Sequence, residues 1–188
     1  MDFVEVQQAK LGERRALEPL LPANAFIWAA GGRDVAAALR DLTFQPAWPD
    51  VRAVGVIVDA EEDPAASASL GAEALAVVGW PRPTGEGIAV DGERRGGVLV
   101  VPGDGRAGAI EAWLWAWAPP ERRACVEAYF ACTPNPGRTE AQRQKACVEV
   151  LAAGFEPTFR RDDLWDLVPV DDPCRDPARQ FVAALRGR

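Results

Sequence analysis

Residues 53–58, AVGVIV, form an almost uninterrupted apolar run that Asp59 follows directly. Such runs are typical of strands buried on both faces of a parallel sheet, and we expect this strand to be central. The acidic stretch DAEEDP at 59–64 comes next, and the alanine-rich residues 65–78 predict a helix with Pro64 at a favoured start position. This part of the chain therefore predicts a strand, an acidic loop and a helix in succession.

The same alternation of strand and helix recurs along the first part of the chain. Apolar runs predict strands at residues 2–6, 25–30 and 97–101, and helical spacing of apolar residues follows these runs. Residues 80–95 are rich in Pro and Gly and predict either an irregular excursion or a hairpin. The alternation predicts an α/β fold with a mostly parallel sheet flanked by helices.

The last third of the chain is dominated by helical patterns. We expect residues 1–118 to form the α/β core and residues 119–188 to form a helical C-terminal addition packed on it, within one domain. The helical patterns occupy residues 119–129, 139–153, 163–168 and 177–185.

The composition excludes several kinds of chemistry. The 188 residues contain no histidine, which removes Ser-His-Asp and Cys-His catalysis and imidazole-ligated zinc. The four cysteines form no CxxC pair, so we expect buried free thiols rather than zinc ligands or disulfides. The N-terminal MDFVEVQQ has no basic region and no long apolar region, and no stretch approaches a membrane span of about 20 apolar residues. We expect a cytoplasmic protein that does not enter a membrane.

The net charge of −7 is distributed unevenly along the chain. Residues 1–118 carry 10 basic and 17 acidic side chains, whereas residues 119–188 carry 11 of each. Because phosphate binding depends on Lys and Arg, this balance argues against a protein that coats nucleic acid non-specifically. Two kinds of partner remain possible: a nucleic acid bound at a local basic surface, and another protein.

Four acidic residues, Glu5, Asp59, Glu61 and Glu111, fall at or just after the expected strands. In an open α/β sheet, functional groups gather beyond the carboxyl ends of the strands. Clustered carboxylates repel one another unless a divalent cation joins them, and oxygen ligands favour Mg²⁺ or Mn²⁺. The alternative is that the acidic run at 61–63 is the solvated start of a helix, where the helix dipole favours acids.

Three basic residues, Arg33, Arg106 and Lys145, are candidates for contact with a phosphate group. Lys145 is the preferred candidate for a positive charge near a phosphoryl transition state. The alternative for each residue is a position on a solvated helix face.

Several stretches of the chain resemble the Toprim family, and specifically an uncharacterised Toprim-like family related to the nuclease domain of the OLD (overcoming lysogenization defect) proteins. The resemblance implies a Toprim fold and Mg²⁺-dependent phosphodiester chemistry, which that family performs with a glutamate after the first strand and an Asp-x-Asp after a later strand. The stretches are VIVDAEEDPAAS at 56–67, AAGGRDVAAALRDL at 29–42, GVLVVPGDGRAGAIE at 97–111, QKACVEVLAAG at 144–154 and DPARQFVAAL at 176–185.

The resemblance also implies catalytic and metal-binding roles for individual residues, carried over one position at a time. Glu5 corresponds to the first-strand glutamate and Asp59 to the first aspartate, and Glu61 is the second acid, with Asp63 as its stand-in. Glu111 corresponds to the further acid that OLD-type domains use around a second metal. Lys145 lies in a region of similarity and is the candidate catalytic cation.

The residues and the resemblance leave two functions open. The first is a metal-dependent nuclease or related phosphodiester-processing enzyme. The second is a catalytically degenerate Toprim-fold binding or partner subunit of a nucleic-acid-processing or defence system. Val6 stands where the family has a glycine and Glu61 where it has an aspartate, and these departures favour the second function, whereas retention of the four acids favours the first.

Overall fold

The structure is a computed structural model that describes residues 2–6, 11–29, 34–133, 137–156 and 158–187. Strands and helices alternate through the first part of the described chain, and helices make up the rest. The strands are β1 (Asp2–Val6), β2 (Ala25–Ala29), β3 (Ala53–Asp59), β4 (Gly87–Asp91) and β5 (Arg94–Val101). The α-helices are α1 (Leu11–Leu17), α2 (Val35–Thr43), α3 (Pro64–Val77), α4 (Glu111–Trp117), α5 (Pro120–Cys132), α6 (Glu140–Phe155) and α7 (Asp176–Leu185). Short 3₁₀ helices are η1 (Glu18–Leu20), η2 (Trp48–Asp50), η3 (Arg161–Asp166) and η4 (Pro173–Arg175).

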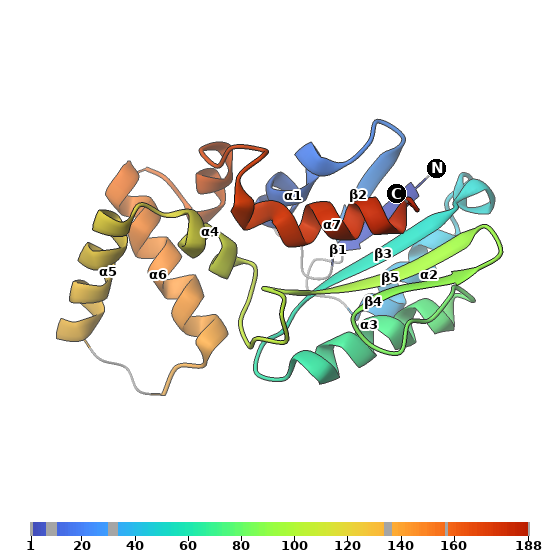
Figure 1. Cartoon of the computed structure of the whole chain (residues 1–188), viewed down its shortest axis with the longest axis horizontal. Coiled ribbons are helices and arrows are strands. Elements are labelled where there is room, and N and C mark those ends of the chain that lie inside the picture. The colour runs from blue at the N-terminus through green and yellow to red at the C-terminus, as the bar shows by residue number, and fades with distance from the viewer. Residues whose placement is uncertain (1, 7–10, 30–33, 134–136, 157, 188) are drawn as a thin grey trace.

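The strands form one sheet in the order β2-β1-β3-β5-β4 (Figure 1). The neighbouring pairs β2–β1, β1–β3 and β3–β5 are parallel, and β4 pairs with β5 as an antiparallel hairpin. The expected α/β fold with a mostly parallel sheet is therefore confirmed, as is the central place of β3. The hairpin settles the alternative left open for residues 80–95, because Gly87–Asp91 is its first strand.

Helices cover both faces of the sheet. Val54, Val56 and Val58 belong to the hydrophobic cluster beneath α2 and α3, whereas Ala53 and Ile57 belong to the cluster on the opposite face. This alternation follows from the two-residue period of a strand. Both faces of β3 are buried, which explains why its sequence is an unbroken apolar run instead of an alternating one.

On the second face, α7 lies across β3 and β5 (Figure 1). Gly55 and Gly97 are partners in the β3–β5 register, and together they leave space for the Phe181 ring. A Cβ at Gly55 would lie 2.8 Å from Phe181 Cε1, and one at Gly97 would lie 2.9 Å from Phe181 Cε2. Leu185 belongs to the same buried cluster as Ile57. The C-terminal helix thus supplies part of the hydrophobic core.

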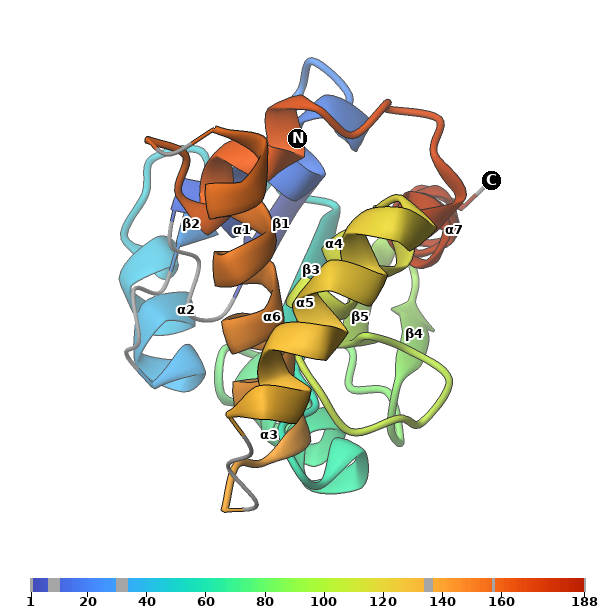
Figure 2. The same cartoon turned by 90° about the vertical axis from the view of Figure 1, so that its left-hand side faces the viewer.

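Helices α4, α5 and α6 lie together beyond one end of the sheet (Figure 1), and Figure 2 views the molecule from their side. The α6 helix begins with a reciprocal capping box between Thr139 and Gln142. Trp117 stacks on Phe155 at 5.7 Å between ring centroids, so α4 and α6 are joined by an aromatic pair. None of the helices in the described ranges is both long and apolar enough to cross a membrane.

The four cysteines are free thiols, but their positions differ from the expectation. Cys147 is buried and Cys174 is partly buried, whereas Cys125 and Cys132 on α5 are exposed. The expectation of burial was wrong for the last two because α5 contributes only Val126 to its buried residues. Most of this helix faces outward.

Candidate functional site

The chain order of the strands reverses around β1, since β2 lies on one side of it and β3 and β5 on the other. The carboxyl ends of β1 and β3 therefore flank a topological switch point, the position where open α/β sheets bind their ligands. Asp59 is the last residue of β3 and pairs in register with Val101, the last residue of β5. The sheet thus places Asp59 at the edge where a ligand is expected.

The two carboxylate oxygens of Asp59 are held by different parts of the chain. Oδ1 accepts a hydrogen bond of 3.0 Å from the backbone N–H of Ile110, and Oδ2 lies 3.4 Å from Nζ of Lys145. The side chain is only 11% exposed. Burial raises the pKa of the Asp59 carboxyl, and the positive charge of Lys145 and the Ile110 hydrogen bond offset this rise in part.

Glu61 is fixed by its backbone more than by its side chain. Its N–H and C=O each form a 2.8 Å hydrogen bond with the backbone of Gly108, and its φ of 49° is in the left-handed region. The side chain is half exposed, and Oε1 lies 3.3 Å from Nζ of Lys145. Lys145 therefore bridges the carboxylates of Asp59 and Glu61.

The loop that carries Gly108 is fastened to α6 by Gln144. Oε1 of Gln144 accepts the backbone N–H of Ala109 at 2.9 Å, and its Nε2 donates to Glu140 at 2.9 Å. A Cβ at Gly108 would lie 2.6 Å from Gln144 Oε1, and the φ of Gly108 is +138°. Only glycine fits this close approach without displacing Gln144 or straining the backbone.

Lys145 is the cation around which the acids are arranged. Burial lowers its pKa, but the negative charges of Asp59, Glu111 and Glu61 outweigh this effect, so that the net pKa is raised. The ammonium group therefore stays protonated at neutral pH. The role of Lys145 as the positive group near a phosphoryl transition state stays a prediction.

Glu111 lies in the first turn of α4 and is almost completely buried, with 4% of its surface exposed. Its Oε1 is 2.7 Å from the guanidinium of Arg161, whereas Oε2 has no hydrogen-bond partner in the described part of the chain. Burial raises the pKa of Glu111; Arg161 opposes the rise and the charge of Asp59 adds to it. Glu111 and Asp59 are thus close enough to affect each other electrostatically.

The remaining predicted site residues have other positions. The carboxylate of Asp63 accepts the Ala66 N–H at 3.0 Å as the N-cap of α3, and its expected role as a stand-in metal ligand stays a prediction. Arg106 lies 3.8 Å from Asp104 and lines a separate cavity. The backbone of Glu5 pairs with Val56, but its side chain, like all of Arg33, lies outside what the structure describes.

Acids and bases alternate among the described residues of this site, and the expected cluster of four carboxylates around a metal stays a prediction because the side chain of Glu5 is not described. Among the residues described, no group of three or more Cys, Asp or Glu side chains is arranged to hold a metal ion. Instead, Lys145 is placed between Asp59 and Glu61, and Arg161 pairs with Glu111. The sequence analysis missed Arg161 and Gln144, because no local pattern around either residue indicates its distant partner.

Comparison of the chain with known protein families, with curated proteins and with solved structures found no match. The resemblance to Toprim domains therefore stays a prediction. Five residues form an acid–base cluster at the end of β3, which we call the β3-end cluster: Asp59, Glu61, Glu111, Lys145 and Arg161.

Proposed function

We propose that the chain is a Toprim-like protein whose β3-end cluster binds Mg²⁺ or Mn²⁺ and processes a phosphate ester. The observation that carries this proposal is the position of the Lys145 ammonium, 3.4 Å from Asp59 Oδ2 and 3.3 Å from Glu61 Oε1. Two carboxylate oxygens from one strand end converge on one positive charge. A divalent cation between the same oxygens is the arrangement that we infer for the active protein.

The donor set is suited to a hard cation. Asp59 and Glu61 offer carboxylate oxygens, which favour Mg²⁺ or Mn²⁺ over softer metals. Glu111 offers a buried Oε2 with no partner among the described residues, and an unsatisfied buried acceptor is costly unless something binds it. When bound, the metal would activate water and neutralise the charge of a phosphate.

The residues of the chain have separate roles in this proposal. Lys145, displaced from the carboxylates by the metal, and Arg161 would both contact the non-bridging phosphate oxygens. The Ile110 N–H orients the Asp59 carboxylate through a bond of 3.0 Å. Because the chain lacks histidine, a proton would be held by Asp59 or Glu111, whose pKa values burial raises.

A second candidate function is a catalytically inactive binding or partner subunit for nucleic-acid processing or defence. The observation that favours it is that Asp59 and Glu111 are each paired with a basic side chain of the same chain. Such pairs compensate the buried charges internally and reduce the gain from binding a cation. On this alternative, the β3-end cluster stabilises the fold and the partner binds elsewhere.

Cleavage assays with a Glu61→Asp variant test the first proposal. Aspartate is tolerated better than glutamate at the left-handed φ of 49° found at residue 61, and its shorter side chain would withdraw from Lys145. We expect weak or no cleavage by the unmodified protein and increased cleavage by Glu61→Asp. The substrates are single-stranded, linear and supercoiled DNA, and RNA, with Mg²⁺ or Mn²⁺.

Two control variants make the assay decisive. Glu62→Asp makes the same change at the exposed neighbouring acid and should leave cleavage unaltered. Asp59→Ala should abolish any cleavage and so excludes contaminating nucleases. Robust cleavage by the unmodified protein that Asp59→Ala abolishes would establish an efficient enzyme, whereas no cleavage by either the unmodified protein or Glu61→Asp would contradict the catalytic proposal and favour the binding subunit.

A further inference from the structure

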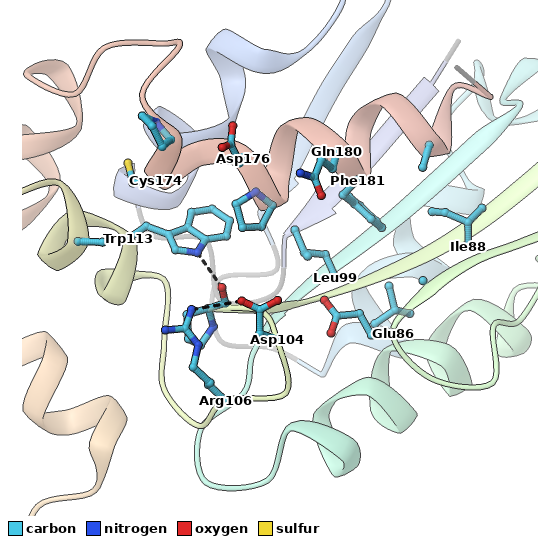
Figure 3. Close-up of a pocket in the computed structure, with 18 residues that line it drawn as sticks. Glu86, Ile88, Leu99, Asp104, Arg106, Trp113, Cys174, Asp176, Gln180 and Phe181 are labelled. Carbon is cyan, nitrogen blue, oxygen red and sulfur yellow. Dashed lines mark hydrogen bonds and ion pairs between the residues drawn. The ribbon is translucent and has the colours of Figure 1, made fainter.

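A cavity of about 610 Å³ lies between the β4–β5 hairpin, α4, α7 and the loop after β5 (Figure 3). Its lining contains none of the β3-end cluster residues. The apolar part of the lining includes Ile88, Leu99, Trp113 and Phe181. A volume of this size, with mostly apolar walls and a few polar groups, is typical of a site for a small organic molecule.

The two aromatic side chains that line the cavity are held rigidly. Trp113 is 4% exposed, and its indole Nε1 donates a 2.9 Å hydrogen bond to the carbonyl of Pro102. The Phe181 ring is wedged into the space that Gly55 and Gly97 leave on the sheet. The cavity is therefore already formed before a ligand arrives, which reduces the entropic cost of binding.

The polar groups of the cavity are mostly acidic. Glu86 and Asp104 contribute carboxylates, whereas the carboxylate of Asp176 is paired with Arg179, and Arg106 is the basic side chain among the described lining residues. Figure 3 shows Gln180 on α7, and Glu86 and Asp104 on the side of the cavity opposite that helix. The Arg106–Asp104 pair is 3.8 Å long and its side chains are 65% and 89% exposed, so the pair is weak and Arg106 is free to move away from Asp104.

We infer that this cavity binds a small organic cation that carries a protonated amine on a flat apolar group. The apolar group would lie between Trp113, Leu99 and Phe181, and the amine would face Glu86 and Asp104. Aromatic walls also attract cations. An anionic ligand such as a nucleotide is disfavoured by the carboxylates of Glu86 and Asp104, so this site is independent of the proposed phosphate chemistry.

Binding at this site is non-covalent. The thiol in the lining belongs to Cys174, and burial, together with its hydrogen bond to Asp172, raises its pKa to about 12. The thiol is consequently neutral at physiological pH and is a poor nucleophile. Shape and charge are the features that select the ligand.

Titration of the ¹⁵N-labelled protein with tryptamine tests this inference. Tryptamine carries an ammonium on a flat indole, whereas indole-3-propionate carries a carboxylate on the same ring and serves as the matched probe of charge. We expect saturable shifts of the Trp113 indole N–H and Gln180 side-chain amide signals with tryptamine. Indole-3-propionate should bind at least about tenfold more weakly, which corresponds to about 1.4 kcal/mol.

Two sets of variants locate the binding site. Glu86→Gln with Asp104→Asn should weaken tryptamine binding at least tenfold while preserving the fold. The glutamine amide oxygen introduced by Glu86→Gln can still accept the Val100 N–H that Glu86 accepts at 3.2 Å, and asparagine tolerates the left-handed φ of 57° at residue 104. Ala184→Trp, at an exposed lining position, should block the cavity, and Ala128→Trp on the exposed face of α5 is its control.

The inference is overturned by any of three results. The first is equal affinity for tryptamine and indole-3-propionate. The second is tryptamine binding that Ala184→Trp leaves unchanged. The third is no saturation of the unmodified protein by tryptamine up to about 10 mM, since weaker binding would be non-specific.

Discussion

Lys145 and Asp59 are 86 positions apart in the chain, yet Nζ of the lysine lies 3.4 Å from Oδ2 of the aspartate. This ion pair joins α6 to the carboxyl end of the central strand. The Ile110 N–H holds the other oxygen of the same carboxylate. The β3-end cluster is therefore built jointly by the α/β core and by the helical addition.

The contact between Gly108 and Gln144 should be essential for the position of Asp59. We expect Gly108→Ala to lower the free energy of unfolding by about 2–5 kcal/mol, since it combines an unfavourable φ with an overpacked contact. It should also weaken divalent-cation binding, because the displaced loop carries Ile110. Urea denaturation and Mn²⁺ titration measure the two effects.

Gly105→Ala is the matched control for this substitution. Gly105 also has a positive φ, of +65°, but a Cβ there would meet nothing within 4 Å. Its replacement should cost only about 1–2 kcal/mol of backbone strain. Equal losses of unfolding free energy in the two variants would show that the Gln144 contact is unimportant. A double variant, Gly108→Ala with Gln144→Ala, that is no more stable than Gly108→Ala would show the same.

The buried carboxyl of Glu111 should make stability depend on pH. Because burial raises its pKa in the folded protein, the folded state retains the proton to higher pH than the unfolded state does. Ionisation therefore costs stability as the pH rises above the ordinary glutamate pKa of about 4.3. We expect the stability of Glu111→Gln relative to the unmodified protein to increase as the pH rises above about 4.3, until Glu111 ionises in the folded state.

Urea denaturation across this pH range measures the difference between the two proteins. The variant leaves Arg161 with other acids, Glu149 at 3.7 Å and Asp162 at 3.5 Å, so loss of the pair does not isolate the guanidinium. Each tenfold change in the acidity constant alters the free energy of unfolding by about 1.4 kcal/mol. If the unmodified protein instead gains stability relative to Glu111→Gln as the pH rises, the attraction of Arg161 outweighs burial.

The glycine pair on β3 and β5 should determine the packing of α7. A Cβ at Gly97 would lie 2.5 Å from Ile88 Cδ1 and 2.9 Å from Phe181 Cε2. We expect Gly97→Ala to destabilise the protein by about 1–3 kcal/mol through overpacking. Gly85→Ala, where a Cβ meets nothing within 4 Å, should change stability by about 0.5 kcal/mol or less. Thermal denaturation compares them, and indistinguishable midpoints would contradict the packing argument.

Arg175 should be the main polar connection between α1, η3 and the start of α7. It is 1% exposed and donates to the carbonyls of Ala16, Trp165 and Val168. We expect Arg175→Met to cost about 3 kcal/mol or more, because it removes several charge-assisted hydrogen bonds and leaves buried acceptors. Urea denaturation measures the loss.

Arg179→Met is the control for Arg175, because it removes a partly exposed arginine near the start of the same helix. Its loss should cost about 1 kcal/mol or less. A comparable cost for the two variants would mean that burial adds nothing to the role of Arg175.

Much of the sheet could be predicted from local sequence. The apolar run ending at Asp59 indicates a central strand because only a strand covered on both faces needs apolar residues at every position. The same reasoning places Asp59 and Glu61 at a carboxyl edge. The sequence could not distinguish an N-cap from a metal ligand at Asp63, because both roles place an exposed carboxylate before a helix.

The partners of the acids could not be predicted because they come from distant segments. Arg161 and Glu111 meet only when η3 and α4 have both packed against α6. Gln144 is an ordinary helix residue until Gly108 approaches it. Charge pattern along the chain identifies where acids gather, but the balance of acids and bases in a site depends on tertiary packing.

Mn²⁺ titration calorimetry tests most directly the claim that Asp59 and Glu61 bind a divalent cation. Asp59→Asn keeps an oxygen that can accept the Ile110 N–H but removes the charge, and it should weaken Mn²⁺ binding about tenfold or more. Lys145→Met should strengthen binding, because the competing ammonium is gone. Asp63→Asn, which preserves the N-cap of α3, should leave the affinity unchanged. Equal Mn²⁺ affinity in the unmodified protein and in Asp59→Asn would contradict the proposed site.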